Sequence, residues 1–261
     1  MHALVTGASS GIGEALAKEL AHAGYDLTLV ARREVELKRV VASLPNGAKT
    51  QVIVADLADL DAASGILVRA EEGLGTLDVL VNNAGIQIVE ATEEVSIDRS
   101  EALLRLNVLA PLRLTRLALP GMLERGRGTI VDIASLAALA PTPGMFHYSA
   151  SKAALAAASE CLRAEVKRRG VHVVTVYPGP VSTAMATAAI DRYDKDPTVG
   201  MPVGRADVLA RLVVAAVRRK KSRVIYPRAY ALARMFPGIT RWVMDTFSPL
   251  PKRLPSGSTG E

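Results

Sequence analysis

Tyr148 and Lys152 stand four residues apart in the chain, and Ser135 stands thirteen residues before Tyr148. Residues four apart share one face of a helix, so the phenol and the ammonium would point into the same space. A free phenol has a pKa of about 10, and a cation held beside it lowers that pKa by stabilising the phenolate. This is the layout of a tuned general acid/base. The pair alone also has a plainer interpretation, in which the tyrosine ring only covers the lysine stem.

A glycine-rich turn near the N-terminus joins a short apolar strand, residues 3–6, to a helical pattern over residues 14–20. Strand, glycine turn and helix are the parts of a dinucleotide-binding unit. In such a unit Gly7 makes the tight turn, Gly11 leaves room for a pyrophosphate, and Gly13 lets helix and strand pack closely. The free N–H groups at the start of the helix would face the phosphates. The alternative is an ordinary glycine-rich connection.

Three asparagines occupy positions where their side-chain amides could bind a ligand. Asn82 and Asn83 end an apolar strand that begins near Leu77. Ligands gather at the carboxyl ends of parallel strands, although Asn also serves simply as a turn residue. Asn107 stands among leucines in a helical pattern and must be hydrogen-bonded if it is buried. A structural role is the alternative for each of them.

Around these residues, short apolar strands alternate with amphipathic helices. We expect strands near residues 2–6, 25–31, 50–55, 77–82, 128–134, 171–177 and 223–226. We expect helices near residues 11–23, 34–44, 59–73, 98–123, 148–169 and 206–219. This alternation predicts an α/β fold, a doubly wound, mostly parallel seven-stranded sheet with helices on both faces, in a single Rossmann-like domain.

The motifs occur together, in one order and with one spacing. They are Thr6-Gly-x-x-x-Gly-x-Gly13, Asn82-Asn83-Ala84-Gly85, Asn107, Ser135, Tyr148-x-x-x-Lys152 and Pro178-Gly179. In this combination the chain resembles the short-chain dehydrogenase/reductase family over residues 1–225. The resemblance implies an oxidoreductase that transfers a hydride between a nicotinamide cofactor and a carbonyl group or secondary alcohol, with the cofactor supplying the hydride chemistry.

The resemblance also assigns roles at four catalytic positions. Tyr148 would be the acid/base, and Lys152 would lower the pKa of Tyr148 and hold the ribose hydroxyls of the nicotinamide. Ser135 would hydrogen-bond the substrate oxygen, and Asn107 would hold a water that connects Lys152 to solvent. In reduction, Tyr148 would protonate the developing alkoxide while Ser135 steadies its charge.

The resemblance further implies a cofactor site along the carboxyl ends of the strands. Asp56 would contact the adenine, or alternatively cap the next helix. Residues 178–183 would line the nicotinamide. The implied cofactor-binding residues are Gly7, Ser9, Ser10, Gly11, Ile12, Gly13, Arg32, Arg33, Asp56, Leu57, Asn83, Ala84, Gly85, Tyr148, Lys152, Pro178, Gly179, Val181 and Thr183.

The end of the second strand indicates which cofactor is preferred. An acidic residue there would bind the ribose 2′-hydroxyl of NAD, but the position is Ala31, followed by Arg32 and Arg33. A guanidinium suits a 2′-phosphate because it can donate two parallel hydrogen bonds. Ser9 in the glycine turn could add a hydroxyl. NADP(H) is therefore favoured over NAD(H), the alternative being that both arginines are solvated residues at the start of the next helix.

Composition sets further limits. The chain has 261 residues and 27.6 kDa, enough for one large domain with a full core. It contains no apolar run of the roughly 20 residues that span a bilayer, and Met1 leads straight into the first strand, leaving no room for a signal peptide. Cys161 is the single cysteine, expected to be a small packed residue, so no internal disulfide can form. We expect a cytoplasmic protein, and the absence of a His/Cys cluster predicts no metal.

The C-terminal part of the chain is more basic and richer in aromatic residues than the rest. Residues 205–261 carry 12 Lys/Arg against 3 Asp/Glu, and five of the ten aromatic residues lie between Tyr226 and Phe247. We expect an amphipathic extension over residues 226–254 and a disordered tail over residues 255–261. The extension could pack on the core, form a wall of the substrate pocket, or make peripheral contact with a membrane or partner. No motif supports nucleic-acid binding.

Two further segments should border the substrate. Residues 184–204 form a long connection, which could be a lid or simply a surface loop. Residues 141–146 would form the opposite wall. The apolar, aromatic C-terminus favours a lipophilic carbonyl or alcohol as the small-molecule substrate, and the alternative function is a non-catalytic protein that senses the cofactor. The alanine-rich helix 148–169 and the helix before it predict a homodimer or homotetramer.

Overall fold

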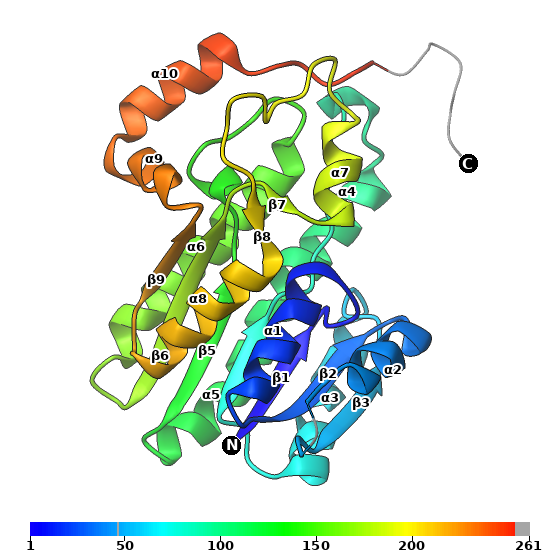
Figure 1. Ribbon diagram of the computed structural model, residues 1–261, viewed down its shortest axis with the longest axis vertical. Helices are drawn as coiled ribbons and strands as arrows, with labels where there is room; N and C mark the ends of the chain where they lie inside the picture. The colour runs from blue at the N-terminus through cyan, green and yellow to red at the C-terminus, as the bar shows by residue number, and fades with distance from the viewer. Residues whose placement is uncertain (46, 254–261) are drawn as a thin grey trace.

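The protein is described by a computed structural model that covers residues 1–45 and 47–253. Its centre is a seven-stranded sheet made of β1 (His2–Thr6), β2 (Asp26–Ala31), β3 (Thr50–Val54), β4 (Val79–Asn82), β5 (Gly128–Ile133), β6 (Val171–Pro178) and β9 (Arg223–Tyr226). The strands pair in the order β3-β2-β1-β4-β5-β6-β9, and every pair is parallel (Figure 1). The predicted doubly wound sheet is confirmed.

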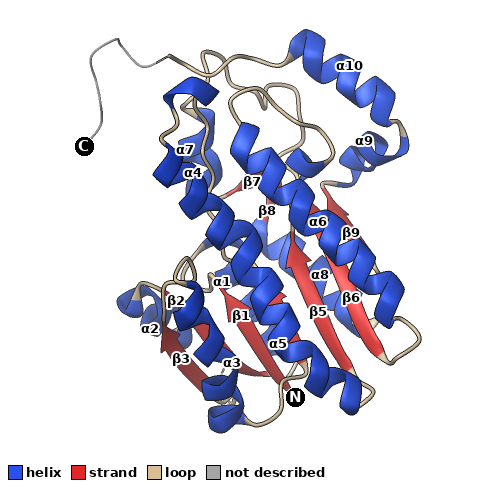
Figure 2. Ribbon diagram, turned by 180° about the vertical axis from the view of Figure 1, so that it is seen from behind, coloured by secondary structure: helices blue, strands red, loops and turns tan. Residues whose placement is uncertain are grey.

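Helices cover both faces of this sheet (Figures 1 and 2). One face carries α1 (Gly11–His22), α2 (Glu34–Ala42) and α8 (Ala206–Arg218). The other carries α3 (Leu60–Leu74), α5 (Ala110–Glu124) and α6 (Phe146–Val166). Among the helices that the structure describes, none has the length and apolar content needed to cross a membrane.

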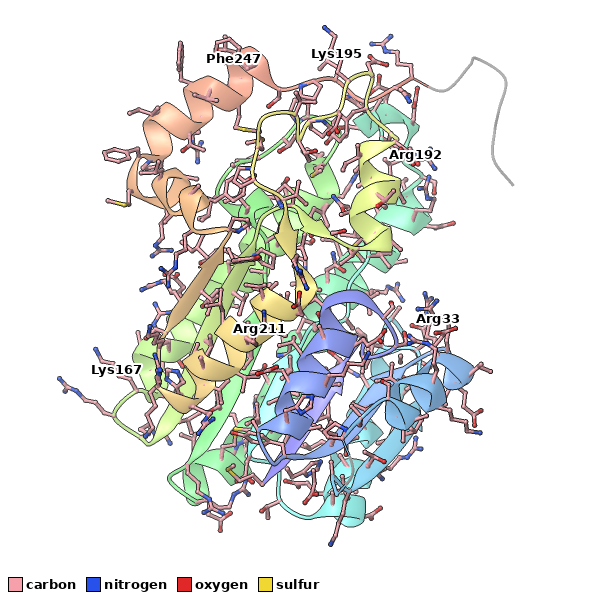
Figure 3. The ribbon with its side chains drawn as sticks, in the orientation of Figure 1. Arg33, Lys167, Arg192, Lys195, Arg211 and Phe247 are labelled. Atoms are coloured by element: carbon pink, nitrogen blue, oxygen red, sulfur yellow. The ribbon has the colours of Figure 1, made fainter. Side chains whose placement is uncertain are left out.

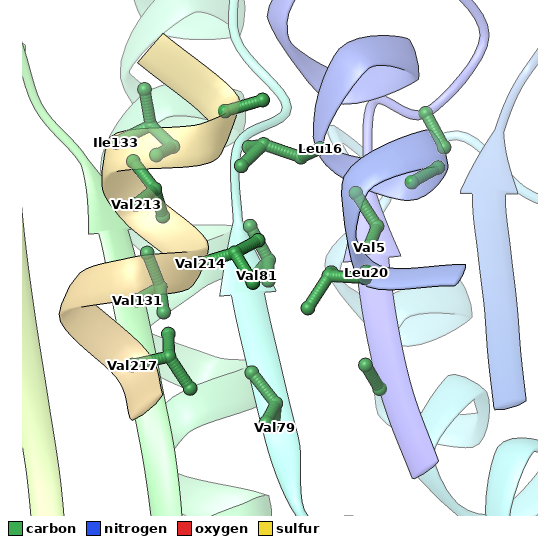
Figure 4. Packing of buried hydrophobic residues seen from close by; sticks show 14 of the residues in the cluster. Val5, Leu16, Leu20, Val79, Val81, Val131, Ile133, Val213, Val214 and Val217 are labelled. Carbon is green, nitrogen blue, oxygen red and sulfur yellow. The ribbon is translucent and has the colours of Figure 1, made fainter. Parts of the chain in front are cut away.

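Alternate residues of each strand face opposite helix layers, as expected for strands buried on both sides. Val5 of β1 packs with α1 and α8, whereas its neighbour Leu4 packs in the cluster that includes α3 and α5. Figure 4 shows the first layer, with the labelled residues Val5, Leu16, Leu20, Val79, Val81, Val131, Ile133, Val213, Val214 and Val217. Burying one such side chain contributes about 1.5–3 kcal/mol. The two layers together hold the carboxyl ends of β1, β4 and β5 in fixed relation.

The helix predicted over residues 98–123 is interrupted. It consists of α4 (Ile97–Leu104), a π-helical turn over Arg105–Leu109, and α5. A π turn inserts one extra residue per turn and is often found at functional sites. Here it contains Asn107, so the interruption bears on the site described below.

Other predicted features differ in detail. The helix predicted over residues 148–169 is α6, which begins at Phe146 and ends at Val166. Cys161 is exposed on α6 rather than packed. The tail predicted to be disordered, residues 255–261, lies outside the described residues.

Several short elements lie beyond the carboxyl ends of the strands (Figure 1). They are the two-stranded parallel sheet of β7 (Val181–Ser182) and β8 (Gly204–Arg205), and the helices α7 (Ala184–Ile190), α9 (Ala231–Met235) and α10 (Pro237–Phe247). The structure describes every residue of α9 and α10, and none of them is buried. The interpretation that this extension packs as core is therefore wrong for these two helices.

Candidate active site

The glycine turn has the geometry that its sequence predicts. Gly7 has a φ of 66° and Gly11 a φ of 58°, values that a residue with a Cβ rarely adopts. A Cβ added to Gly13 would lie 2.2 Å from the carbonyl oxygen of Gly7, so only glycine allows α1 to pack this closely. Ser10, at the N-cap of α1, makes no side-chain cap hydrogen bond. The first N–H groups of α1 are thus left for another acceptor.

A hydroxyl and an amide brace this turn against β4. The hydroxyl of Thr6 donates to the carbonyl of Val81 at 3.1 Å and accepts from the backbone N–H groups of Asn83 and Ala84 at 2.9 and 3.0 Å. The Asn83 amide donates to the carbonyl of Thr6 at 2.8 Å. The side chain of Asn83 is therefore structural. Thr6 is a site residue that sequence reasoning missed, although a hydroxyl at the end of the strand before Gly7 was a usable signal.

A single cavity of about 1360 Å³ runs along the carboxyl ends of the strands. All nineteen predicted cofactor residues line it, as does Ser135. The cavity also reaches apolar residues of α7 and α10, which lie in the two segments expected to border the substrate. In the part of the chain that the structure describes, no group of three His, Cys, Asp or Glu side chains is placed to hold a metal ion.

At one end of the cavity, Arg33 meets two hydroxyls of the glycine turn. Its Nη2 donates to the Oγ atoms of Ser9 and Ser10, both at 3.2 Å. Arg32 instead lies 3.7 Å from a carboxylate oxygen of Asp56, with both side chains largely in solvent. Asp56 does not cap α3, because Asp59 accepts from the first N–H groups of that helix. The cluster of one guanidinium, two hydroxyls and the start of α1 fits a phosphate group.

Tyr148 and Lys152 lie on the first two turns of α6, facing the end of β5. The ammonium of Lys152 lies 5.9 Å from the centroid of the Tyr148 ring, and it donates to the carbonyl oxygen of Ile133 at 2.8 Å. Ser135, just after β5, accepts from the N–H of Ala137 at 3.1 Å. The predicted sharing of one helix face is present, and it brings the three side chains to one point of the cavity wall.

Burial sets the protonation of this group. Desolvation raises the pKa of Tyr148, and hydrogen bonding from Ser135 acts against the rise. Desolvation also lowers the pKa of Lys152 to about 8, which the nearby Asp132 carboxyl opposes. The expectation that Lys152 lowers the pKa of Tyr148 stays a prediction, since the net shift of Tyr148 is upward. The ammonium is turned to the carbonyl of Ile133 rather than to the phenol oxygen, so desolvation dominates.

Asn107 is fully buried behind the cavity wall. Its amide accepts from the N–H of Ile86 and donates to the carbonyl of Ile86, both at 2.9 Å, and it also donates to the hydroxyl of Ser151 at 3.1 Å. A Cβ on Gly85 would lie 3.0 Å from the Asn107 oxygen and 3.4 Å from the Lys152 ammonium. Asn107 and Lys152 thus converge on the bare backbone of Gly85.

The comparisons with known proteins agree with this geometry. The family model described as short chain dehydrogenase matches residues 1–194. The chain belongs to this family. It is therefore an oxidoreductase that acts on carbonyl groups or the corresponding alcohols.

Curated relatives of this dehydrogenase include two acyl-CoA reductases. It is 38% identical over 199 residues to the very-long-chain 3-oxoacyl-CoA reductase of Anas platyrhynchos, a match that covers 74% of this chain and 64% of the relative. It is 37% identical over 246 residues to a fatty acyl-CoA reductase of Mycobacterium tuberculosis, covering 92% of this chain and 81% of the relative. The dehydrogenase thus spans less than two thirds of the length of the first of these proteins.

Among solved structures, a short-chain dehydrogenase from Sphingobium yanoikuyae in complex with NADPH superposes with a TM-score of 0.80 at 29% identity. The match covers 100% of this chain and 98% of that one. The likeness confirms the fold of the dehydrogenase over the residues that the structure describes.

Close enough to Lys152 to interact with its charge, the dehydrogenase buries a carboxyl group that sequence reasoning missed. Asp132, on β5, is 3% exposed and accepts from the amide of Asn82 at 2.8 Å. Burial raises its pKa, which hydrogen bonds from Asn82 and Ser159 and the charge of Lys152 oppose. The strand pattern gave no sign of Asp132, because a polar residue in a buried strand needs partners from distant segments.

The substrate end of the cavity is built from three segments. Thr142 and Met145 line it, as predicted for residues 141–146. In the connection over residues 184–204, Tyr193 is 2% exposed and donates its hydroxyl to the carbonyl of Pro143 at 2.9 Å. The dehydrogenase therefore anchors this connection as part of the wall, and its interpretation as a free surface loop is wrong at Tyr193.

The third segment is the C-terminal extension. The cavity-lining residues of α9, α10 and the residue between them are Leu232, Ala233, Phe236, Ile239, Thr240, Val243, Met244, Thr246 and Phe247. Six of these nine side chains are large and apolar. The substrate end of the cavity is therefore more apolar than the end that contains Arg33. The predicted pocket wall is present.

Proposed function

We propose that this dehydrogenase uses NADP(H) and reduces the carbonyl group of a lipophilic substrate of the long-chain acyl type. One observation carries the proposal. A single cavity joins the cluster of Arg33, Ser9 and Ser10 at one end to the apolar walls of α9 and α10 at the other, with Tyr148 between them. The reacting carbonyl belongs at the middle, where the phenol lies.

The cofactor choice rests on the arginine end. A 2′-phosphate carries close to two negative charges and accepts several hydrogen bonds, which one guanidinium and two serine hydroxyls can donate. The uncapped start of α1 would take the pyrophosphate, and Lys152 would hold ribose hydroxyls. The bound cofactor would supply the hydride. Ala31 leaves no carboxylate to bind a free 2′-hydroxyl or repel a phosphate.

The raised pKa of Tyr148 fits the role of proton donor in the reduction. Because burial raises its pKa, the phenol carries its proton throughout the neutral range. Such a group is ready to donate to the alkoxide that forms on a reduced carbonyl. Ser135 lies at the same point of the wall and would hydrogen-bond the same oxygen.

The substrate class rests on the apolar end. Long alkyl chains gain about 0.8 kcal/mol for each CH₂ group that leaves water, which corresponds to roughly a fourfold gain in affinity. The two curated relatives described above are named for fatty or very-long-chain acyl substrates. A long 3-oxoacyl or alkyl ketone would place its carbonyl at Tyr148 and its chain against Phe236, Val243 and Phe247.

The test is to follow NADPH and NADH oxidation with a series of ketones and 3-oxoacyl thioesters of increasing chain length. We expect a preference for NADPH, and a kcat/KM that rises by up to about fourfold for each added CH₂ until the cavity is full. NADPH binding without turnover of any member of the series would instead identify a cofactor-sensing protein and reject the proposal.

We also propose a symmetric homodimer or homotetramer in the cytoplasm. On α6, Ala156 is buried against the sheet, whereas Ala153, Ala154 and Ala157 are exposed and let a partner helix approach closely. The neighbouring α5 exposes Leu112 and Leu117.

A further inference from the structure

The C-terminal helices expose large apolar side chains outside the cavity lining. Met235, at the end of α9, is 66% exposed, and Trp242 on α10 is 61% exposed. Neither of them lines the cavity. One 17-residue segment, Ala231–Phe247, therefore leaves a tryptophan and a methionine side chain in contact with water, at a cost in free energy. We name Met235 and Trp242 the outer face of the extension.

This outer face borders the mouth of the cavity. Ile239, Val243 and Phe247 lie on the same helix as Trp242, line the cavity, and are 61%, 40% and 67% exposed. Spacing of three and four residues places Ile239, Trp242 and Val243 on one stripe of α10. The ring of Trp242 also packs edge-on against Phe247, with centroids 5.9 Å apart. An apolar surface is therefore continuous from the outside of the protein into the substrate end.

The extension that carries the apolar stripe has more basic than acidic side chains. Between residues 226 and 253, five Lys/Arg residues face one acidic residue, Asp245. Of these, Arg234 is paired with Glu160, while Arg241 and Lys252 are exposed. Lys195 comes to the same end of the molecule from the connection after α7, close to the end that carries Phe247 (Figure 3). Asp194 and Asp196 flank Lys195, so the positive charge comes from the extension itself, and we call its exposed basic side chains the basic rim.

We propose that the outer face of α9 and α10 docks on the surface of an anionic lipid bilayer, so that the cavity mouth opens towards the lipid. An amphipathic helix with apolar aromatic side chains and a basic rim is suited to the headgroup boundary. A second copy of the chain is disfavoured, because a twofold interface would place the basic rim against itself. The inference that substrate enters from the bilayer rests on the proposed function, but the docking itself does not.

The chain carries its own reporter for this contact, because Trp242 is its only tryptophan. The full-length protein is titrated with phosphatidylglycerol vesicles while its tryptophan emission is recorded, with phosphatidylcholine vesicles as the comparison. We expect a blue shift with the anionic vesicles, quenching by brominated acyl chains, and a clearly weaker response with the zwitterionic ones. Emission that is unchanged by phosphatidylglycerol overturns the proposal. So does a blue shift that grows with protein concentration in the absence of vesicles, which would place Trp242 in a contact between copies.

Two variants separate docking from folding and catalysis. Met235→Glu and Arg241→Glu lie outside the cavity lining and retain the reporter Trp242. Each should lower the fraction of protein that sediments with phosphatidylglycerol vesicles by about 10-fold in partition coefficient. Val68→Glu is the matched control, since Val68 is 58% exposed on α3, and it should sediment like the unmodified protein. Equal sedimentation of all three variants and the unmodified protein overturns the proposal.

The turnover of a soluble short ketone distinguishes this inference from the proposed function. Both docking variants should keep that turnover, and they should lose rate only with a long-chain ketone presented in vesicles. Turnover without vesicle binding would overturn the docking and leave the proposed function standing. Vesicle binding without turnover of any ketone would support the docking and reject the proposed function.

Discussion

Arg234 of α9 lies 2.9 Å from the carboxylate of Glu160 on α6. The same carboxylate pairs with Arg223 of β9 at 2.7 Å and accepts from the hydroxyl of Tyr177 at 2.9 Å. One glutamate therefore fastens the C-terminal extension to the body of the fold. The helices α9 and α10 contain no buried residue, so the extension is attached by this ion pair together with the buried Tyr230 and backbone hydrogen bonds between residues 192–194 and 250–252.

We expect Glu160→Gln to loosen this wall of the cavity. Charge-assisted hydrogen bonds that are partly exposed contribute about 1–2 kcal/mol together after solvent screening, so the melting temperature should fall by a few degrees. The KM for a bulky ketone should rise while the affinity for NADPH stays the same. Glu165→Gln on the exposed side of α6 is the control. Equal effects of both substitutions would show that the ion pair does not hold the wall.

The stability difference between the unmodified protein and Glu160→Gln should depend on pH. The hydrogen bond from Arg223 and those from Arg234 and Tyr177 hold the pKa of Glu160 well below its usual range, against the opposing effect of burial. A depressed carboxyl pKa adds stability that is complete above the unfolded pKa of about 4.3 and is lost as pH falls below it. The melting-temperature gap between the two proteins should therefore be constant from pH 7 to about 5.5 and shrink towards pH 4. A gap that widens on acidification contradicts this assignment.

Tyr148→Phe should lower kcat by at least about 100-fold with every good substrate and leave the NADPH dissociation constant nearly unchanged, because only the proton donor is removed. Lys152→Ala should impair both turnover and cofactor binding. Tyr25→Phe, at a buried tyrosine far from the site along the chain, serves as the control and should stay active. A near-normal kcat for Tyr148→Phe would refute the acid/base assignment.

The pH profile of kcat/KM should reflect Lys152. Its pKa of about 8 predicts that kcat/KM for NADPH-dependent reduction falls as pH rises through this value and the ammonium loses its proton. The Asp132 carboxyl opposes the effect of burial, so Asp132→Asn should move this limb to lower pH by roughly half a unit to one unit. Asp78→Asn, at the opposite end of β4, should leave the limb in place. A limb that stays where it is in Asp132→Asn would exclude Asp132 from setting the charge of Lys152.

For the cofactor, we expect Arg33→Ala together with Arg32→Ala to weaken NADPH binding by roughly 10- to 1000-fold and to change NADH binding little. Arg33→Ala alone should account for most of the loss, because Arg33, unlike Arg32, donates to the hydroxyls of Ser9 and Ser10. Lys38→Ala on α2 is the control for a lost surface charge. Fluorescence titration with each cofactor measures the effect, and equal losses for NADPH and NADH would refute the preference.

Light scattering at micromolar concentration should give the mass of a dimer or tetramer. Ala154→Arg should reduce it to that of the monomer or dimer, since an arginine on the exposed face of α6 blocks close helix approach. Ala62→Arg on α3 makes the same change at another exposed alanine and should leave the mass unchanged. A monomeric mass for the unmodified protein would contradict the predicted assembly.

Local patterns in the sequence were sufficient to predict the order of strands and helices and the fold class of this protein. The alternation of strands and helices predicted a doubly wound sheet because period-two and helical patterns follow from backbone geometry alone. Glycine spacing predicted the tight turn at Gly7 and the close packing at Gly13, because both depend on backbone geometry within a few neighbouring residues. The four-residue separation of Tyr148 and Lys152 likewise predicted that they share one face of a helix.

What the tertiary structure decided involves contacts between residues far apart in the chain. Asn83 braces Thr6 only because β4 pairs with β1, and no spacing within either strand indicates that hydrogen bond. Burial turns Lys152 to the carbonyl of Ile133, and it keeps the Tyr148 pKa raised rather than lowered. The aromatic C-terminal pattern predicted an amphipathic element but not its position. Apolar periodicity predicts that a helix has one apolar face. Only the folded structure shows whether other parts of the protein bury that face or leave it exposed to solvent.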